Sequence, residues 1–227
     1  MQLVTIARIH TDFPAKFGIP RQSGLVDALK GRIVFEPDFR DPTALRGLED
    51  YSHLWLIWQF SESVMERWSP TVKPPRLGGN RRMGVFATRS PFRPNPLGLS
   101  CVKLERIEAS TSEGPVLHVA GADLLDGTPI YDIKPYLPYA DCHAEASGGF
   151  AEGVMDAQLA VLFPDDLLAM VPEDRREALI QVLEQDPRPG YRTDDGTRRY
   201  GMAFAGLDVG FTVDGQTLTV TDITPLD

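Results

Sequence analysis

Residues 84–100, GVFATRSPFRPNPLGLS, begin and end as apolar, strand-like segments and carry polar and proline residues between them. Proline fixes φ and lacks a backbone N–H, so the prolines here hold the connection in an extended, non-helical course. The connection presents Arg89, Arg93 and Asn95 from a rigid backbone. Such a loop between two strands is typical of a site for an anionic or carboxylate-bearing ligand.

Short apolar runs separated by proline and glycine turns continue along most of the chain. We expect strands at residues 3–10, 31–35, 53–60, 84–88, 97–107, 116–120 and 128–135. Because no useful helical period separates them, they favour an antiparallel barrel or sandwich, and no Gly-x-Gly-x-x-Gly motif follows a strand to indicate a Rossmann-type site. Alternation places Trp55 and Trp58 on opposite faces of one strand, which favours packing over a base-stacking surface.

The pattern changes near Ser147-Gly148-Gly149, a small and flexible stretch. Beyond it we expect a helix at residues 172–185, which starts at a proline and carries an apolar stripe. Strands are then expected at residues 200–207, 209–213 and 218–223. The predicted fold class is therefore mainly β, with an N-terminal antiparallel β-barrel at residues 1–146 and a small α+β C-terminal domain at residues 147–227.

Composition narrows the class of protein. Among 227 residues, 42% are hydrophobic and 24% are charged, as in ordinary soluble domains. No apolar run reaches the roughly 18 residues of a membrane span, and the N-terminus lacks the basic start and cleavage site of a signal peptide. With only Cys101 and Cys142, neither a disulfide framework nor a cysteine zinc site is expected, and the cytoplasm is favoured. The scattered histidines predict no metal site.

The net charge of −9 argues against a general nucleic-acid binder, because neutralising phosphates requires clustered lysine and arginine. The arginines are nevertheless unevenly distributed, and two groups stand out. These are Arg81, Arg82, Arg89 and Arg93, and then Arg188, Arg192, Arg198 and Arg199. For the second group, composition leaves an RNA-binding patch and a simply solvated surface equally open.

Residues 88–100, TRSPFRPNPLGLS, resemble the signature of the TsaA-like, or TrmO, family of S-adenosylmethionine-dependent tRNA methyltransferases. Three further segments resemble family motifs in order and spacing: KFGIPRQ at 16–22, LLDGTPIYDIKPY at 124–136 and DPRPGY at 186–191. The resemblance covers nearly the whole chain. It implies a cofactor-binding β-barrel, a C-terminal domain that faces tRNA, and a homodimer.

The resemblance also implies which residues contact S-adenosylmethionine. They are Pro20, Arg21, Gln22, Ser61, Glu62, Arg89, Leu99, Asp126, Gly127, Thr128 and Pro129. Local sequence by itself favours a ligand role only for Arg89, whereas Asp126-Gly127 requires no more than a turn. Family members often carry histidine where this chain has Ser61, so a backbone contact there is expected to survive while the side-chain role stays open.

The implied reaction is methylation of the exocyclic nitrogen of threonylcarbamoyl-modified adenosine, immediately 3′ of a tRNA anticodon. Methyl transfer from a sulfonium needs alignment of donor and acceptor rather than a covalent enzyme intermediate. The acceptor nitrogen is a weak nucleophile, so a base or a stabilising cation is expected nearby. We expect Arg188 to meet the threonyl carboxylate and Tyr191 to stack on a base, while Asp186 is either the base or a helix terminator.

Because residues 186–191 lie far in sequence from the implied cofactor contacts, this segment is expected to act on the acceptor side only. Two alternative functions remain. One is a non-catalytic S-adenosylmethionine sensor or RNA-binding module, and the other is a methyltransferase with a different acceptor. Transfer of label from the cofactor to tRNA distinguishes an enzyme from a sensor.

Overall fold

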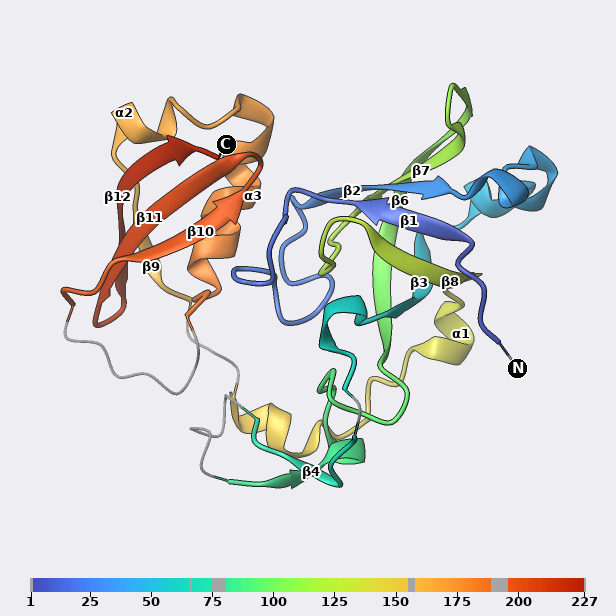
Figure 1. Ribbon diagram of the computed structural model, residues 1–227, viewed down its shortest axis with the longest axis horizontal. Coiled ribbons are helices and arrows are strands. Elements are labelled where there is room, and N and C mark those ends of the chain that lie inside the picture. Colours follow the sequence, from blue (N-terminus) through green and yellow to red (C-terminus); the bar gives the residue numbers. More distant parts are fainter. Residues whose placement is uncertain (1, 66, 75–80, 155–157, 189–195, 227) are drawn as a thin grey trace.

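The computed structural model describes residues 2–65, 67–74, 81–154, 158–188 and 196–226, and its first unit is a closed β-barrel (Figure 1). The barrel order is β1-β2-β7-β6-β3-β8, and each neighbouring pair is antiparallel. The strands are β1 (Ala7–His10), β2 (Lys30–Phe35), β3 (His53–Gln59), β6 (Leu97–Thr111), β7 (Gly114–Ala120) and β8 (Thr128–Pro135). The predicted antiparallel barrel is confirmed.

Alternating side chains fill the barrel, as period-2 burial requires. Along β3 every second residue is buried, so Leu54, Leu56 and Trp58 point inward while Trp55 is only half-buried. The predicted placement of Trp55 and Trp58 on opposite faces is confirmed. The core is completed by aliphatic residues of the other strands, including Ile9, Ile33, Val102, Leu117, Val119 and Ile130.

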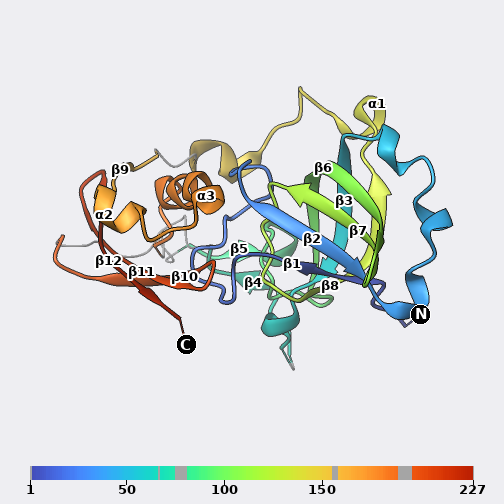
Figure 2. The same cartoon turned by 90° about the horizontal axis from the view of Figure 1, so that it is seen from above.

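The second unit is a four-stranded sheet packed against a helix (Figure 2). Its strand order is β10-β11-β12-β9, and β9 pairs in parallel with β12. Its elements are β9 (Ala160–Leu162), α2 (Asp165–Leu168), α3 (Glu173–Glu184), β10 (Tyr200–Phe204), β11 (Leu207–Asp214) and β12 (Thr217–Pro225). The predicted helix is α3, and its buried stripe is Ala178, Leu179, Val182 and Leu183.

The loop between β1 and β2, residues 11–29, is called the first loop here, and it joins the two units (Figure 1). Phe13, Val26 and Leu29 from this loop are buried in the core of the second unit rather than in the barrel. The Phe13 ring meets the Phe204 ring edge-on with centroids 5.3 Å apart. Asp12 forms an ion pair with Arg175 of α3, with N and O atoms 2.8 Å apart. The loop is therefore anchored to the second unit at several points.

The expectation of a strand at residues 84–88 is wrong. The segment is a two-residue strand, β5 (Met83–Gly84), followed by the 3-10 turn η6 (Val85–Ala87). β5 pairs only with the equally short β4 (Thr71–Val72). Since a strand persists only while a neighbour continues its hydrogen bonds, the chain turns after Gly84, which pairs with Thr71 at the start of β4. Arg89 therefore follows a turn and not a strand.

Other predicted bounds shift at their ends. The strand expected at 3–10 pairs only from Ala7, that expected at 97–107 continues to Thr111, and that expected at 200–207 ends at Phe204. Ala205 and Gly206 have positive φ values of 50° and 77°, which turn the chain after β10. The remaining short helices are η1 (Pro37–Phe39), η2 (Pro42–Leu45), η3 (Leu48–Asp50), η4 (Ser61–Ser63), α1 (Pro138–Asp141) and η7 (Gly149–Val154). In the part of the chain described, no helix is long and apolar enough to cross a membrane.

Candidate functional site

The implied cofactor residues lie on connections at one mouth of the barrel. With all neighbouring strands antiparallel, the ends of β1, β3 and β7 and the starts of β2, β6 and β8 share that mouth. Three connections are therefore neighbours. They are the first loop, the long connection from β3 to β6 (residues 60–96, called the excursion) and the turn between β7 and β8. Barrel closure thus brings together motifs that are far apart in sequence.

The first loop contacts the turn that follows β3. Lys16 Nζ donates to the backbone oxygen of Glu62 at 2.6 Å and lies 3.6 Å from Glu62 Oε2. Ser61 and Glu62 form the short turn η4 and expose their side chains. The Ser61–Glu62 backbone is thus held beside the first loop, where a backbone contact to a ligand needs no particular side chain at position 61.

Arg89 meets the other end of the first loop. Its Nη1 donates to the side-chain oxygen of Gln22, and Gln22 Nε2 donates to the backbone oxygen of Arg21. Two of the implied cofactor residues are therefore in direct contact across 67 sequence positions. The arrangement places a guanidinium and a carboxamide together, which are donors suited to a carboxylate and to a planar base.

The loop that carries Arg89 is braced by its own hydrogen bonds. Thr88 Oγ1 donates to the backbone oxygen of Val85 at 2.8 Å, and Arg93 Nη1 donates to the backbone oxygen of Thr88 at 3.1 Å. Ser90 Oγ accepts from the N–H of Phe92 at 3.2 Å. Arg93 therefore fixes the loop from within, while Arg89 reaches out of it to Gln22.

Leu99 lies near the start of β6 and is 56% exposed. It pairs with Ile57 of β3, whereas β7 pairs with β6 only from Lys103 onward. The open edge before Lys103 meets the first loop instead, since the N–H of Cys101 donates to Ser23 Oγ at 3.1 Å. The exposed Leu99 side chain is available for contact with an apolar part of a ligand.

The predicted turn Asp126-Gly127 leads directly into β8. The Asp126 carboxylate accepts from the N–H of Thr11 at 3.0 Å and lies 3.2 Å from His10 Nδ1. Gly127 has φ of 74°, a conformation that glycine adopts without strain. Thr128 and Pro129 are buried, and Thr128 Oγ1 donates to the backbone oxygen of Leu125 at 2.7 Å. Among these residues, only Asp126 exposes its side chain.

The turn reaches the rest of the site through the first loop. The N–H of Asp126 donates to the backbone oxygen of Phe13 at 2.9 Å. Among the described contacts, none joins residues 126–129 directly to Arg89. The first loop therefore connects the Asp126 turn at its start with Arg89 at its end.

The C-terminal motif also adjoins the first loop. Asp186 follows α3 with φ of 49°, and both of its carboxylate oxygens bind the Arg188 guanidinium at 2.8 Å. Arg21 Nη2 lies 3.5 Å from the backbone oxygens of Asp186 and Arg188. A cavity of about 30 Å³ remains between Pro20 and the end of α3, which is room for about one water molecule. Tyr191 lies outside the described residues.

The C-terminal motif and the first loop are neighbours in the fold although they are far apart in sequence. Residues 186–188 are distant from the first loop along the chain, yet they lie against Arg21 in space. Asp186 and Arg188 form a bidentate ion pair, called the Asp186–Arg188 unit below, in which the carboxylate fixes the direction of the guanidinium. The helix end places this unit beside the implied cofactor loop.

Sequence reasoning missed Ser100 and Asp123. Ser100 is buried in β6, and its hydroxyl joins Trp58 Nε1 at 3.0 Å to Asp123 Oδ1 at 2.6 Å. Burial raises the pKa of the Asp123 carboxyl, while the Ser100 hydrogen bond and the Arg89 charge oppose that rise. The available signals were a polar residue at an inward position of an apolar strand and an acidic residue just before the Asp126 turn.

Comparison with known proteins assigns the family. The model of the tRNA-methyltransferase O N-terminal domain matches residues 8–142, and that of the TrmO C-terminal domain matches residues 156–226. The chain belongs to the TrmO family. A solved structure of TrmO from Pseudomonas aeruginosa aligns with a TM-score of 0.79 and 35% identity, covering 99% of this chain and 98% of that one. The match confirms the predicted mainly β fold.

Relatives in the TrmO family carry names that describe enzymes. The tRNA (adenine(37)-N6)-methyltransferase of Escherichia coli K12 is 40% identical over 226 residues, covering 93% of this chain and 96% of that protein. A Pseudomonas aeruginosa protein named as the S-adenosylmethionine-dependent methyltransferase RcsF is 43% identical over 211 residues, covering 90% and 89% respectively. Similarity therefore extends over both units of the chain.

Proposed function

We propose that the chain is an S-adenosylmethionine-dependent tRNA methyltransferase that acts at the exocyclic nitrogen of threonylcarbamoyladenosine next to the anticodon. Membership of the TrmO family across both units supports the activity. The observation that supports a site for this activity is the contact of Arg89 with Gln22 at the barrel mouth, beside the Asp186–Arg188 unit. The residues proposed to bind the cofactor thus lie beside those proposed to bind the acceptor.

The residues at the mouth fit the cofactor chemically. Arg89 suits its carboxylate, Gln22 suits the edge of adenine, and the exposed Asp126 carboxylate suits ribose hydroxyls. Leu99 offers an apolar surface. When bound, S-adenosylmethionine supplies an electrophilic methyl group. The chain binds and orients the reactants, so the rate gain comes from alignment and not from a covalent intermediate.

The Asp186–Arg188 unit is the proposed acceptor side. Arg188 meets the threonyl carboxylate, and Asp186 holds the guanidinium in a fixed direction through its two hydrogen bonds of 2.8 Å. Because both Asp186 oxygens are engaged, its position after α3 favours the orienting and helix-terminating role over that of a base. Tyr191 is proposed to stack on a neighbouring base.

The direct test is nucleoside analysis of tRNA from cells that lack the gene, together with transfer of labelled methyl to purified tRNA. We expect loss of the methylated threonylcarbamoyladenosine, and its restoration by the purified protein. Methylation of another nucleoside would contradict the proposed acceptor and identify a different one. Cofactor binding without any turnover would assign the chain as a sensor.

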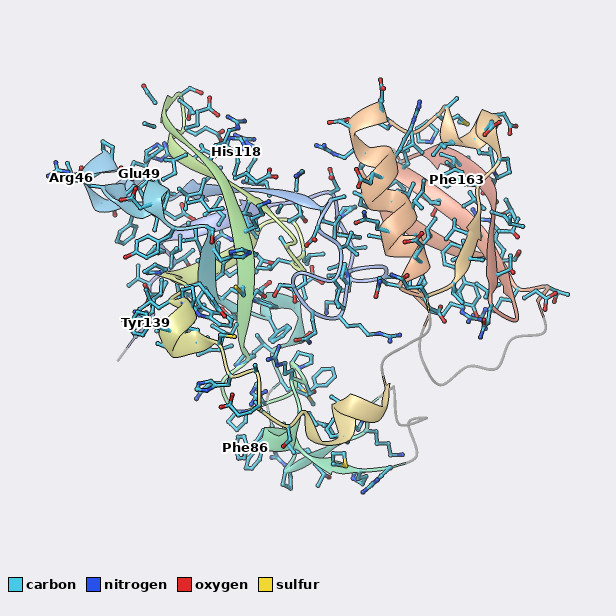
Figure 3. The ribbon with its side chains drawn as sticks, turned by 180° about the vertical axis from the view of Figure 1, so that it is seen from behind. Arg46, Glu49, Phe86, His118, Tyr139 and Phe163 are labelled. Carbon is cyan, nitrogen blue, oxygen red and sulfur yellow. The ribbon has the colours of Figure 1, made fainter. Side chains whose placement is uncertain are left out.

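We also propose a homodimer in the cytoplasm, where tRNA substrates are found, with the domain division at residues 146 and 147. Exposed aromatic side chains on the excursion between β3 and β6 support the dimer (Figure 3). Trp68 is 50% and Phe86 is 73% exposed, and their ring centroids lie 6.2 Å apart. Exposed apolar groups of this kind mark association surfaces. Sedimentation of wild type and Phe86→Glu tests it, since the variant should shift toward monomer.

A further inference from the structure

A half-buried carboxylate, Asp123, stands at the same mouth of the barrel but has no part in the proposed reaction so far. It lies between the end of β7 and the turn that precedes β8. Its Oδ1 accepts from Ser100 Oγ at 2.6 Å, and the backbone N–H of Ser23 also donates to it. Strand β6 and the loop between β1 and β2 therefore each aim a donor at one carboxylate.

The carboxylate is held in place by a buried relay. Ser100 is 1% exposed, and its hydroxyl accepts from Trp58 Nε1 at 3.0 Å while donating to Asp123. Gly98 leaves the space that the Trp58 ring occupies. The indole N–H orients the hydroxyl, and the hydroxyl orients the carboxylate. Burying such polar groups costs free energy unless each has a hydrogen-bond partner. Its result is a carboxylate with a fixed direction.

Arg89 provides an opposite charge close to Asp123. Its guanidinium donates to Gln22, whose neighbour Ser23 accepts from the N–H of Cys101, the residue after the Ser100 that binds Asp123. The Arg89 charge also opposes the rise that burial causes in the pKa of the Asp123 carboxyl. A cation and an anion thus stand at the same mouth of the barrel, and the described contacts include no ion pair between them. This arrangement complements a zwitterion, which carries a carboxylate and an ammonium close together.

Resting on the proposed function, we propose that Arg89 and Asp123 together bind the amino-acid end of S-adenosylmethionine, with Asp123 accepting hydrogen bonds from its α-ammonium and Arg89 binding its α-carboxylate. The Trp58–Ser100 relay keeps Asp123 aimed at that group. Asp123 is therefore a cofactor-binding residue and Ser100 is a positioning residue. A bound ammonium also favours the charged form of the carboxylate.

The test compares ligands with and without the amino-acid end. Affinities of S-adenosylmethionine, S-adenosylhomocysteine and 5′-methylthioadenosine are measured by calorimetry for wild type and Asp123→Asn. The asparagine keeps an acceptor for Ser100 but loses the charge. We expect about 10- to 100-fold weaker binding of the first two ligands, the scale of a charge-assisted hydrogen bond, and unchanged binding of methylthioadenosine. Asp38→Asn, an exposed site on η1, is the control.

Ser100→Ala separates positioning from folding, with thermal unfolding followed in parallel. We expect a smaller loss, about 3- to 10-fold, again confined to the two ligands that carry the amino acid. Equal weakening of methylthioadenosine by Asp123→Asn would overturn the proposal, because the residue would then act on the nucleoside or on the fold. Unchanged affinity for all three ligands would also overturn it. If wild type binds these ligands but does not methylate tRNA, the proposed function fails while this comparison still stands.

Discussion

Among single residues, Arg89 has the strongest claim to a ligand role. The residue contacts Gln22, and internal hydrogen bonds of Thr88 and Arg93 hold its loop. A site whose side chains are held before the ligand arrives loses less entropy on binding. This argues for a preformed cofactor site at the barrel mouth.

Replacing Arg89 by alanine should weaken binding of both S-adenosylmethionine and S-adenosylhomocysteine by about 1.5–3 kcal/mol, because one charge-assisted contact is lost. Isothermal titration calorimetry measures the change. Arg46→Ala is the control, since Arg46 lies between η2 and η3 at the opposite mouth (Figure 3). Unchanged affinity in Arg89→Ala would remove Arg89 from the site.

Gly98 tests how closely Trp58 is packed beneath the site. A Cβ added at Gly98 would overlap the Trp58 ring, whereas one added at Gly84 would meet nothing within 4 Å. We expect Gly98→Ala to destabilise the fold by about 1–3 kcal/mol through overpacking, and Gly84→Ala to have little effect. Urea unfolding of both variants makes the comparison. Equal stabilities would show that the Trp58 ring can move aside.

At the scale of elements, the first loop couples the two units. Its apolar side chains are buried in the second core, while Gln22 and Lys16 contact the barrel excursion. The same segment thus carries implied cofactor contacts and forms one side of the contact between the units. Its conformation is accordingly expected to affect both stability and cofactor binding.

Gly18 provides the test of that coupling. It has φ of 94°, and a Cβ there would overlap the Met202 sulfur, whereas Gly24, with φ of 74°, has open space. Alanine costs about 1–2 kcal/mol at either site for the backbone, and overlap adds about 1–3 kcal/mol at Gly18 only. We expect Gly18→Ala to lower both thermal stability and cofactor affinity more than Gly24→Ala. A Gly18 variant with lower stability but normal affinity would uncouple the two.

The Asp186–Arg188 unit is the second element with a testable role. Arg21 lies 3.5 Å from its backbone oxygens, which Arg188→Ala retains, so the variant should leave cofactor affinity intact. Loss of the guanidinium should slow single-turnover methylation, most for tRNA that bears the threonylcarbamoyl group. Calorimetry and rapid-quench assays give the two values. Lost cofactor binding would place the unit in the cofactor pocket, and full activity would reduce it to a helix end.

At the scale of the whole molecule, the charge of −9 leaves tRNA binding to a few arginines. Not all arginines of the C-terminal unit are equivalent. Arg199 is held by Asp208 at 3.1 Å and by Asp222 at 2.5 Å, and its hydrogen bonds lower the pKa of Asp222 to about 2. Arg198 instead lies over the Tyr200 ring, 5.1 Å from its centroid.

We therefore expect tRNA affinity to fall steeply with salt, and Arg198→Ala to weaken it more than Arg199→Ala. Each phosphate contact removed should reduce the salt slope by about one. Filter binding at a series of salt concentrations measures both effects. Tight binding that is insensitive to salt, or no effect of Arg198→Ala, would contradict an electrostatic mode on this face.

Elements that depend on local pattern were predictable. Strand β8 was predicted with its observed bounds, α3 differs by one residue at each end, and the alternation of β3 placed Trp55 and Trp58 correctly. Periodicity and proline placement act within a few residues, so the amino-acid order carries them. The strand expected at 84–88 failed because a strand also needs a partner, and β4 supplies only two residues.

Other features depend on closure of the barrel and on packing of the second unit. Closure sets the Arg89–Gln22 contact and the Trp58–Ser100–Asp123 relay, while the packed second unit places Arg21 against residues 186–188. Arg21 and Asp186 are 165 positions apart, and no local preference relates them. The order of amino acids thus determined the strands, the helix and the motifs. Tertiary structure alone decided which motifs meet, because only the closed antiparallel sheet brings their connections to one mouth and only the second core fixes the loop between them.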